Sequence, residues 1–513
     1  MAREHSNVAD FLLEGKPDGR IALRLLSGEV SYGELRQAAA AFVRYFGDLG
    51  CRKGDRIVLA AENSPFWVGA YLGILKAGLI CVPLPPSIAP EDLRDVLTVT
   101  ESRVAVMQDR VAINHAALLH GVHLITDQSM HDREVAGLWG FLSEATFSQI
   151  RSYSTSGKSL GQDVHPDDIA ALMFTSGSTG KPRGVMISHR NIAANTKSII
   201  ECLGLTESDR IMTVLPFHYC FGASLLHTHL KVGASLVIDA RFMYPETVLQ
   251  RMEEMECTGF AGVPSHFQIL LRNSGLGKRA FPRLRYVQQA GGHLAPVFIQ
   301  ELKRRLPGTQ IFVMYGQTEA TARLSYLPPE CLEAKLGSVG KGIPGVSLRV
   351  ASEAGSDVNP GEIGEIVAEG ENIARGYWRD PEETAKTFRN GRLYTGDLAT
   401  VDQDGFIYVI ERVKQILKCG GKRVSCRQVE NRILEFECAL EAAVVPTPDD
   451  VLGEAAKAFL VARMPDCPAF EDCFRAFCKQ HMPPQFVPKE FVVLSELPKN
   501  ASGKVLKQKL GTV

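Results

Sequence analysis

Short apolar runs alternate with helix-like segments through the first part of the sequence, and this alternation constrains the fold more than any other feature. Residues 56–61 have the pattern of a buried strand, residues 66–77 that of a helix, and residues 79–83 that of a second strand. The same order returns at 211–215, 221–230 and 235–238, and around a helical pattern at 296–306. A strand, a crossover helix and a second strand make a unit of parallel sheet. We therefore expect an α/β fold with two wound, mostly parallel sheets.

A helix is predicted between Ser31 and Gly50. Ser31 and Glu34 have the spacing of a capping box, and Gly50 ends the pattern. Apolar residues recur between them at helical spacing, at Leu35, Phe42, Phe46 and Leu49. One face of this helix should therefore pack inward.

The pattern changes near Gly361. Residues 365–368 and 406–410 are short β-like runs separated by glycine and aspartate. They predict a small β subdomain, at about 340–410, within a large N-terminal domain of residues 1–410.

A second domain is predicted after Glu411. A polar stretch with glycines comes first. Strand patterns follow at 442–446, 458–461 and 491–494, and an amphipathic helix is predicted at 470–479. About 100 residues of this kind are enough for an independent core. We expect a compact C-terminal α+β domain at 415–513.

The composition sets limits on compartment and partners. The 57 Lys and Arg residues balance 58 Asp and Glu, which leaves a net charge of −1 and favours neither nucleic acid nor an anionic membrane. The twelve cysteines include no C-x-x-C pair, which predicts reduced thiols. The first ten residues lack the apolar core of a signal peptide, and the longest apolar stretch, 69–86, is interrupted by Lys76 and ends in prolines. We expect a cytoplasmic protein without a membrane span.

A loop rich in glycine and hydroxyl groups follows the strand pattern at 169–174. It has the sequence TSGSTGKPRGV, from Thr175 to Val185. Glycines let backbone N–H groups approach phosphate oxygens, and the hydroxyls and Lys181 add donors, so the loop suits a polyphosphate. Its spacing differs from a Walker A loop. Taken alone, the loop would be better explained as a plain Ser/Gly hairpin loop.

The sequence resembles the adenylate-forming superfamily, which contains acyl-CoA synthetases, peptide-synthetase adenylation domains and luciferases. The resemblance begins with TSGSTGKPRGV and continues in the family's order through five further motifs: 215–219 (LPFHY), 315–320 (YGQTEA), 394–398 (YTGDL), 411–414 (ERVK) and 498–504 (PKNASGK). It covers nearly the whole chain. It implies a large N-terminal domain and a mobile C-terminal cap with the active site between them.

The motif after the strand pattern at 310–314 has a physical reason of its own. An aromatic ring, a hydroxyl and a carboxylate follow this strand, at the edge where α/β sheets bind ligands. The resemblance implies that Tyr315 stacks on adenine, Thr318 contacts phosphate and Glu319 holds Mg²⁺, a cation that prefers oxygen ligands. Asp397 is short and acceptor-only when ionised, so it can take both ribose hydroxyls as donors. The resemblance implies this role for Asp397, with Arg412 assisting.

The resemblance also implies the full set of nucleotide contacts. ATP or AMP is expected to be bound by Thr175, Ser176, Gly177, Ser178, Thr179, Gly180, Lys181, Gly291, Gly292, Tyr315, Gly316, Gln317, Thr318, Asp397 and Arg412. The implied catalytic residues are Lys504, Thr318 and His218. Lys504 would stabilise the charge that develops at the pentavalent phosphorus.

Other positions carry the implied acyl and thiol sites. His218, Tyr219 and Phe267 are expected to line the acyl pocket, Gly420 and Gly421 the thiol tunnel, and Lys414 the hinge at 411–414. Amino-acid-activating relatives usually have an aspartate near Tyr219, so its absence argues against a conventionally bound α-ammonium group. Two departures, Cys426 and Gln428, replace the common Pro and Glu and leave details of the thiol loop open.

We predict ATP-dependent activation of a carboxylic acid to an acyl adenylate, with release of pyrophosphate, and transfer to the phosphopantetheine thiol of coenzyme A or of a separate carrier protein. The chain contains no carrier domain, so the acceptor should act in trans. The alternatives are an amino-acid adenylating enzyme, a luciferase-like oxygenase and a non-catalytic nucleotide-binding protein. A P-loop kinase or ATPase is disfavoured by the loop spacing. The sequence does not identify the acid.

Overall fold

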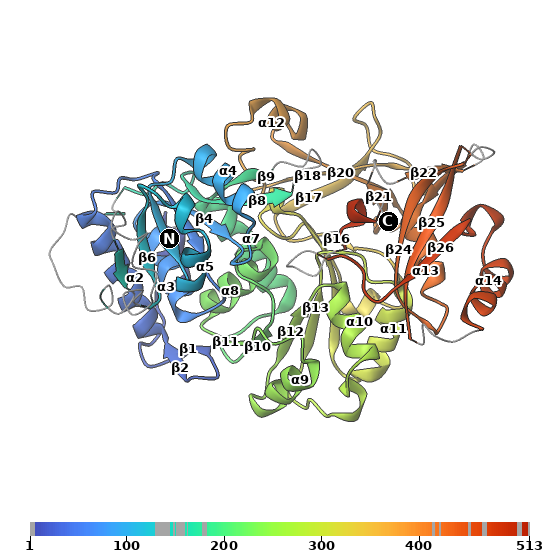
Figure 1. Ribbon diagram of the computed structural model, residues 1–513, viewed down its shortest axis with the longest axis horizontal. Coiled ribbons are helices and arrows are strands. Elements are labelled where there is room, and N and C mark those ends of the chain that lie inside the picture. Colours follow the sequence, from blue (N-terminus) through green and yellow to red (C-terminus); the bar gives the residue numbers. More distant parts are fainter. Residues whose placement is uncertain are drawn as a thin grey trace.

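Two wound sheets, a β subdomain and a C-terminal α+β unit make up the computed structural model (Figure 1). The structure describes residues 6–128, 144–146, 149, 160–161, 163–176, 182–412, 416–419, 422–449, 453–463, 469–499 and 505–510. Figure 1 places the two wound sheets at the left and centre, the β subdomain above them and the C-terminal unit at the right. The expected α/β class with two wound sheets and an α+β unit is confirmed.

The first wound sheet has the strand order β7-β6-β5-β3-β4-β8-β9. Its strands pair in parallel except for the antiparallel hairpin β8–β9. Their bounds are β3 (Arg56–Ala60), β4 (Ile80–Leu84), β5 (Val104–Met107), β6 (His123–Thr126), β7 (Glu144–Thr146), β8 (Ile169–Ser176) and β9 (Pro182–Ser188). The helices of this region are α2 (Tyr32–Asp48), α3 (Pro65–Lys76), α4 (Pro90–Thr100) and α5 (Asp109–Asn114).

The second wound sheet has the order β16-β15-β14-β13-β12-β10-β11-β1-β2, and its six central strands are parallel. Its strands are β1 (Ile21–Arg24), β2 (Glu29–Ser31), β10 (Arg210–Thr213), β11 (Ser235–Ile238), β12 (Gly259–Gly262), β13 (Tyr286–Gln289), β14 (Gln310–Tyr315), β15 (Ser325–Leu327) and β16 (Lys341–Gly342). The helices are α1 (Val8–Leu13), α7 (His189–Leu203), α8 (Cys220–Val232), α9 (Pro245–Glu254), α10 (Pro264–Arg272) and α11 (Pro296–Arg305).

One hydrophobic core joins the two wound sheets. It contains side chains from both sheets, such as Ile57 of β3 and Ile211 of β10, and from the helices α1, α3, α7 and α8 that pack between them. Helix α3 is buried on nearly all sides, and Tyr71 on it donates or accepts a 2.8 Å hydrogen bond with the ring of His227 on α8. The sheets are therefore fixed relative to each other by helix packing.

The predicted capping box is confirmed. The side-chain oxygen of Ser31 accepts a hydrogen bond from the Glu34 backbone, and the Glu34 carboxylate accepts one from the Ser31 backbone. Helix α2 begins at the next residue and ends at Asp48, two residues before Gly50, which has a positive φ of 74°. Local sequence signals therefore set both ends of this helix.

The β subdomain is an antiparallel sheet with the order β17-β18-β20-β19, and β21 pairs with β20. Its elements are β17 (Val346–Ala351), β18 (Gly364–Gly370), α12 (Pro381–Thr387), β19 (Phe388–Arg389), β20 (Arg392–Val401) and β21 (Ile407–Arg412). The prediction of a small β subdomain is confirmed.

Three elements of the C-terminal unit lie in the stretch after Glu411 for which the sequence predicts no regular structure. Strands β22 (Ile416–Cys419) and β23 (Lys422–Ser425) form a hairpin, and helix α13 (Cys426–Ile433) follows at once. Cys426, Val429 and Ile433 supply the buried face of this helix, so its apolar spacing was present but short. The remaining elements are β24 (Ala439–Asp449), β25 (Gly453–Ala462), α14 (Phe470–His481) and β26 (Glu490–Leu494).

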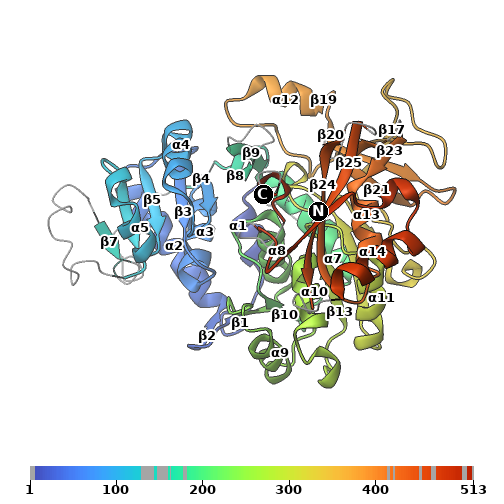
Figure 2. The ribbon, with the colours of Figure 1, turned by 45° about the vertical axis from the view of Figure 1, so that its right-hand side comes forward.

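The C-terminal unit packs against the second wound sheet through α10 and α11, as Figures 1 and 2 both show. Helix α10 contacts β24, and Leu434 enters the core of that sheet. The ring nitrogen Nε2 of His293 lies 2.9 Å from Oδ1 of Asn431. The cap thus meets the main domain next to the segment that follows β13.

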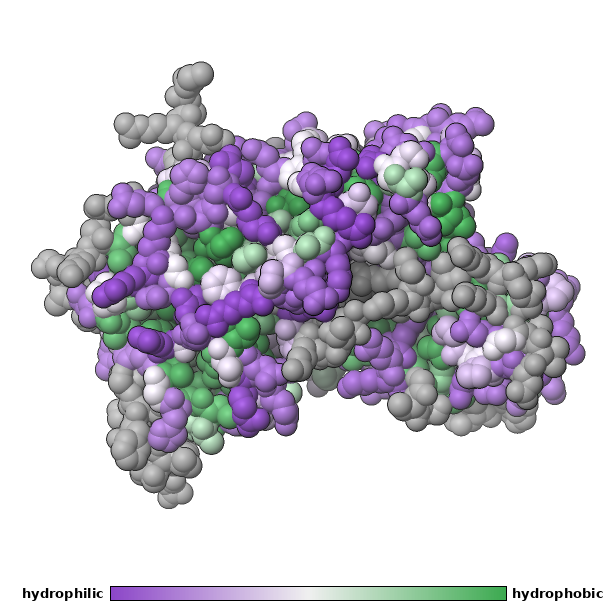
Figure 3. Space-filling view, turned by 90° about the horizontal axis from the view of Figure 1, so that it is seen from above, coloured by the Kyte–Doolittle hydropathy of each residue, from purple (hydrophilic) through white to green (hydrophobic). Residues whose placement is uncertain are grey.

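The described surface is largely polar on one side. Hydrophilic side chains predominate on the face seen from above, with apolar residues between them (Figure 3). Among the helices that the structure describes, none combines the length and the apolarity needed to cross a bilayer.

Buried histidines make stability depend on pH. His229 on α8 is fully buried, with Nδ1 2.9 Å from the Leu225 carbonyl oxygen and Nε2 3.0 Å from the Tyr286 hydroxyl. Burial lowers the pKa of His229 to about 4. Below its ordinary pKa near 6.5, the unfolded chain binds a proton here that the folded chain does not, so stability is lost as the pH falls toward 4.

We expect His229→Gln, which keeps a polar side chain but does not titrate, to flatten this dependence. Its thermal unfolding midpoint should fall less between pH 6.5 and 5 than that of the parent, because each pH unit withdraws about 1.4 kcal/mol per such histidine. His481→Gln changes an exposed histidine and should leave the parent's slope unchanged. Parallel curves for His229→Gln and the parent would contradict the assignment.

Candidate active site

The carboxyl ends of β10, β12, β13 and β14 gather the candidate residues at one edge of the second wound sheet. The four strands are parallel, with Met212 opposite Phe260, Gly262 opposite Gln289, and Gln289 opposite Val313. The segments that follow them carry His218, the Gly291–Gly292 turn and the residues after Tyr315. Parallel strands place these segments side by side, at the edge where α/β sheets bind ligands.

Two candidate nucleotide contacts meet directly. The hydroxyl of Tyr315, at the end of β14, donates a 2.7 Å hydrogen bond to Oδ2 of Asp397 on β20. Asp397 is 6% exposed, and Arg412 lies opposite it in the β20–β21 ladder. The β subdomain thus brings its aspartate to the end of a strand in the wound sheet.

Thr318 and Glu319 form a short 3₁₀ turn, η3 (Thr318–Ala320), immediately beyond Gln317. The Thr318 hydroxyl lies 3.5 Å from Sγ of Cys220, at the start of α8. The Glu319 carboxylate accepts a 2.8 Å hydrogen bond from the Tyr377 hydroxyl. Burial, and then the nearby Glu319 charge, raise the pKa of Tyr377. The sequence reading missed Tyr377, because no local pattern marks it.

A strained turn follows the candidate metal ligand. Thr321 has φ +67° and ψ −45°, and the Ala322 N–H donates to the Ala320 carbonyl at 2.7 Å, which defines a γ-turn. This conformation is rare for a β-branched residue. The Thr321 hydroxyl secures the turn by donating to the Asn372 carbonyl at 2.7 Å.

Gly316 is required by close packing against this turn. A Cβ at Gly316 would lie 1.9 Å from the Ala322 carbonyl oxygen. The structure therefore supplies a packing reason for a glycine that the resemblance links to nucleotide binding.

The turn at Gly291 and Gly292 also lies at the sheet edge, after β13. Gly291 has a φ of +80°, and a Cβ there would lie 3.0 Å from Cγ1 of Val263. Both glycines are exposed, and the Gln289 side chain donates to the Gly292 carbonyl at 2.7 Å. The turn leaves its backbone open to a ligand.

The loop predicted to bind phosphate connects β8 to β9. Thr175 pairs with Arg183 and Ser176 with Pro182, so the loop is the tip of an antiparallel hairpin. Gly177, Ser178, Thr179, Gly180 and Lys181 lie outside the described residues, and so do Lys414, Gly420, Gly421 and Lys504. For Ser176 and Arg412, the described part is the backbone.

His218 lines a cavity of about 550 Å³. The cavity lies between the two wound sheets, and its lining includes Arg110, Phe242 and His266. His218 is buried, which lowers its pKa to about 3 and keeps the ring neutral at physiological pH. The ring of half-buried Tyr219 lies 4.4 Å from it.

Phe267 was expected beside His218 in the acyl pocket. The structure places Phe267 in the core of the second wound sheet, 1% exposed, with its ring edge-on to Phe260. Its neighbour on α10, His266, lines the cavity instead.

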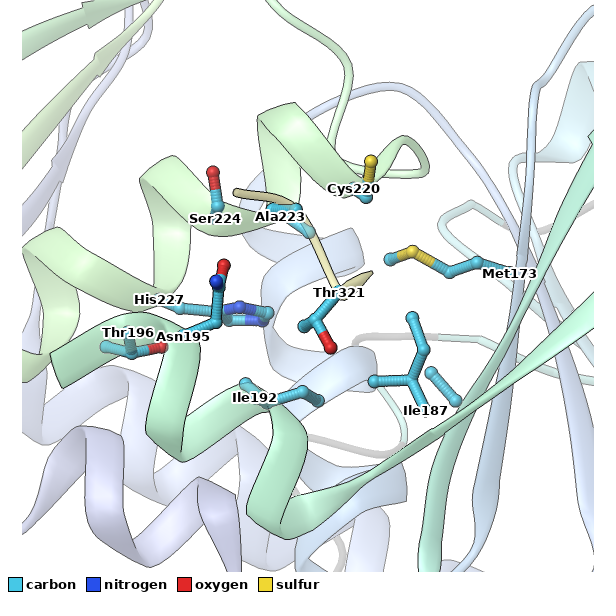
Figure 4. A pocket seen from close by; sticks show the side chains of 12 residues that line it. Met173, Ile187, Ile192, Asn195, Thr196, Cys220, Ala223, Ser224, His227 and Thr321 are labelled. Atoms are coloured by element: carbon cyan, nitrogen blue, oxygen red, sulfur yellow. The ribbon is translucent and has the colours of Figure 1, made fainter. Parts of the chain in front are cut away.

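A second cavity, of about 10 Å³, is about the size of one water molecule. Met173, Cys220 and Thr321 surround it, from β8, α8 and the turn after η3 (Figure 4). It lies directly behind Thr318, whose hydroxyl contacts Cys220.

The segment that carries Lys504 begins close to the larger cavity. Lys499 and Val505 form an isolated β-bridge, so residues 500–504 connect two paired positions. Burial, and then the charge of Lys499, lower the pKa of His266 to about 4. The C-terminal unit therefore brings Lys499, which precedes this segment, close to α10.

Comparison with known proteins gives the family. The family model described as "AMP-binding enzyme" matches residues 13–378, and the model described as "AMP-binding enzyme C-terminal domain" matches residues 428–504. The chain belongs to the AMP-binding enzyme family. This membership confirms the resemblance to the adenylate-forming superfamily.

Relatives of this AMP-binding enzyme cover nearly its whole length. A 2-succinylbenzoate–CoA ligase of Geobacillus sp. (strain WCH70) is 29% identical over 493 residues, which is 96% of this chain and 94% of the relative. A long-chain-fatty-acid–CoA ligase of Salmonella typhimurium (strain LT2) is 27% identical over an alignment that covers 94% of this chain and 90% of the ligase. The crystal structure of the anthranilate CoA ligase AuaEII with anthranoyl-AMP matches with a TM-score of 0.89 at 25% identity, over 99% of this chain and 96% of that one.

The residues present suit a magnesium ion only together with a polyphosphate. Among the described residues, no group of three His, Cys, Asp or Glu side chains could hold a metal ion. Glu319 alone offers a carboxylate beside the expected phosphate position, and Mg²⁺ commonly takes one or two carboxylates with substrate phosphates and water.

We expect Gly316→Ala to disrupt the candidate nucleotide site. The added methyl group must displace the Thr321 turn, which should cost about 1 to 3 kcal/mol, lower the thermal unfolding midpoint and weaken AMP binding in calorimetry. Gly19→Ala is the control, because its Cβ would have no neighbour within 4 Å. Unchanged AMP affinity in Gly316→Ala would show that the turn is not part of the site.

Proposed function

We propose that this protein activates a carboxylic acid with ATP and then transfers the acyl group to coenzyme A. In the first step, a carboxylate oxygen attacks the α-phosphorus of ATP and pyrophosphate leaves. In the second step, the thiol sulfur attacks the carbonyl carbon of the acyl adenylate and AMP leaves. Positioning and charge stabilisation carry the first step.

The hydrogen bond from Tyr315 to Asp397 is the observation that carries this proposal. It joins two nucleotide motifs that are 82 positions apart and belong to different sheets. With Tyr315 on adenine and Asp397 on ribose, the phosphates extend toward Thr318 and the β8–β9 loop. Glu319 would hold Mg²⁺, which neutralises phosphate charge when bound.

The cavity beside His218 supports the second step. It is large enough for an extended arm, it reaches the predicted gate at His218, and its lining carries the ion pair of Arg110 with Glu62 at 2.7 Å. Gly420 and Gly421, at the turn between β22 and β23, would admit the thiol, and Lys414 would be the hinge of a cap spanning 415–513. Coenzyme A is the favoured acceptor because relatives along the whole chain are named CoA ligases. A carrier protein is the alternative.

The acid substrate is best identified by testing a panel of carboxylic acids for pyrophosphate release. We expect ATP and the correct acid to give pyrophosphate and the acyl adenylate, and coenzyme A to convert the adenylate to a thioester with release of AMP. Asp397→Ala should weaken ATP binding by about 1.5 to 3 kcal/mol, because it removes a charged hydrogen-bond partner. Asp404→Ala, which removes an exposed aspartate of the same subdomain, is the control. Release of ADP, or turnover without acid, would exclude an acid ligase.

Two variants test whether the cap moves between the half-reactions. Lys504→Ala should slow adenylate formation by about 100-fold or more, the scale of one lost electrostatic donor, yet spare thioester formation from supplied acyl adenylate. Lys414→Pro, which locks φ near −65°, should keep adenylation and lose transfer. Equal losses in both half-reactions for either variant would exclude the two-conformation mechanism.

A further inference from the structure

Arg323 is buried behind the candidate active site, and no residue that the structure describes forms an ion pair with it. It is 1% exposed and lies four residues after Glu319. Its guanidinium carbon lies 3.9 Å from the centroid of the Phe221 ring, and its Nε–H points to Sδ of Met314 at 3.5 Å. Within the described part of the chain, its Nη2 has no hydrogen-bond partner.

No described carboxylate forms an ion pair with this guanidinium. Its titratable neighbour is the Cys220 thiol, whose pKa is raised by burial, so the thiol stays neutral. Burial lowers the pKa of Arg323 to about 10, which still leaves it protonated at neutral pH. An aromatic face and a thioether compensate a buried charge only in part, and buried charges are normally paired.

The backbone holds Arg323 in a fixed position. The Arg323 N–H donates to Oδ1 of Asn195 at 3.3 Å, and its carbonyl accepts from the side chains of Asn195 and Asn372 at 2.9 and 3.0 Å. The strained turn at Thr321 directs the chain inward just before it. Strain and buried hydrogen bonds of this kind are typical of pre-organised functional positions.

Phe221 connects Arg323 to the site. The Phe221 ring stacks on the guanidinium, and a Cβ at Gly291 would lie 3.8 Å from the same ring. On the other side, Cys220 contacts the Thr318 hydroxyl and lines the small cavity with Thr321 and Ala322 (Figure 4). The guanidinium is therefore one side chain away from the sheet edge where the acid would be activated.

We propose that Arg323 binds a second anionic group of the acid substrate, remote from the carboxylate that is adenylated. The substrates are then dicarboxylic acids or acids with a comparable second negative charge. A guanidinium offers a carboxylate two parallel N–H donors and would gain the missing counter-ion on binding. This inference rests on the proposed function, since it names the substrate class of the same site.

The test compares aliphatic and aromatic dicarboxylic acids with their monoamides, which have the same shape but lack the second charge. The readout is kcat/KM for acid-dependent pyrophosphate release at saturating ATP. We expect the parent to prefer the best diacid over its monoamide by about 10- to 150-fold, the scale of a hydrogen bond to a charged group. Arg323→Met should abolish this preference while it keeps activity on the monoamide, and Arg323→Lys should keep part of it.

Arg272→Met is the matched control. Arg272 is also largely buried and lies over an aromatic ring, at 5.0 Å from Phe298, but it is paired with Glu301 at 2.5 Å. Its loss should lower stability and leave the diacid preference unchanged.

The outcomes separate the two proposals. If monocarboxylic acids or monoamides react as well as diacids in the parent, or if Arg323→Met keeps the parent's preference, the inference is wrong and the proposed function stands. If no acid releases pyrophosphate, the proposed function itself fails. Should Arg323→Met fail to fold, the parent's preference and its reduction in Arg323→Lys decide, together with a thermal shift that the diacid but not its monoamide produces.

Discussion

The parallel pairing of β10, β12, β13 and β14 is the constraint on which the candidate site depends. Because all four strands run in the same direction, the segments that leave them meet at one edge. Backbone groups at these ends are no longer used by the sheet, so they are open to a ligand, as at Gly291 and Gly292. Hydrophobic burial on both faces of the sheet fixes this register. The site is thus a consequence of how the core packs.

The segment from Tyr315 to Arg323 supplies most of the polar side chains at that edge. Tyr315 reaches across to Asp397, and Glu319 is oriented by Tyr377, so the β subdomain is fastened at two points. The γ-turn at Thr321 then returns the chain to the interior, and Gly316 is needed to let it pass. The strained turn at Thr321 therefore lies between the Glu319 carboxylate, at the candidate site, and the buried Arg323 guanidinium.

The C-terminal unit contacts the main domain through the apolar side chain of Leu434 and also through polar groups. His293, which follows the Gly291–Gly292 turn, bonds to Asn431, and the Glu411 carboxylate accepts a hydrogen bond from the backbone of Arg427 at the start of α13. Such contacts can exchange with water more readily than a buried apolar interface.

The sequence by itself determined the fold class, the two wound units, the helix α2 with its capping box and the order of the nucleotide motifs, because these depend on local periodicity and on short spacings. It did not reveal α13, because this helix is only eight residues long and has few apolar positions. It also did not reveal the burial of Phe267, whose neighbour on α10, His266, faces the cavity instead. Only the tertiary structure brought Tyr377 to Glu319, Tyr315 to Asp397 and Arg323 to a buried position where no described residue pairs with its charge. These relations join residues that are distant along the chain or are set by a strained turn, and no local pattern encodes them.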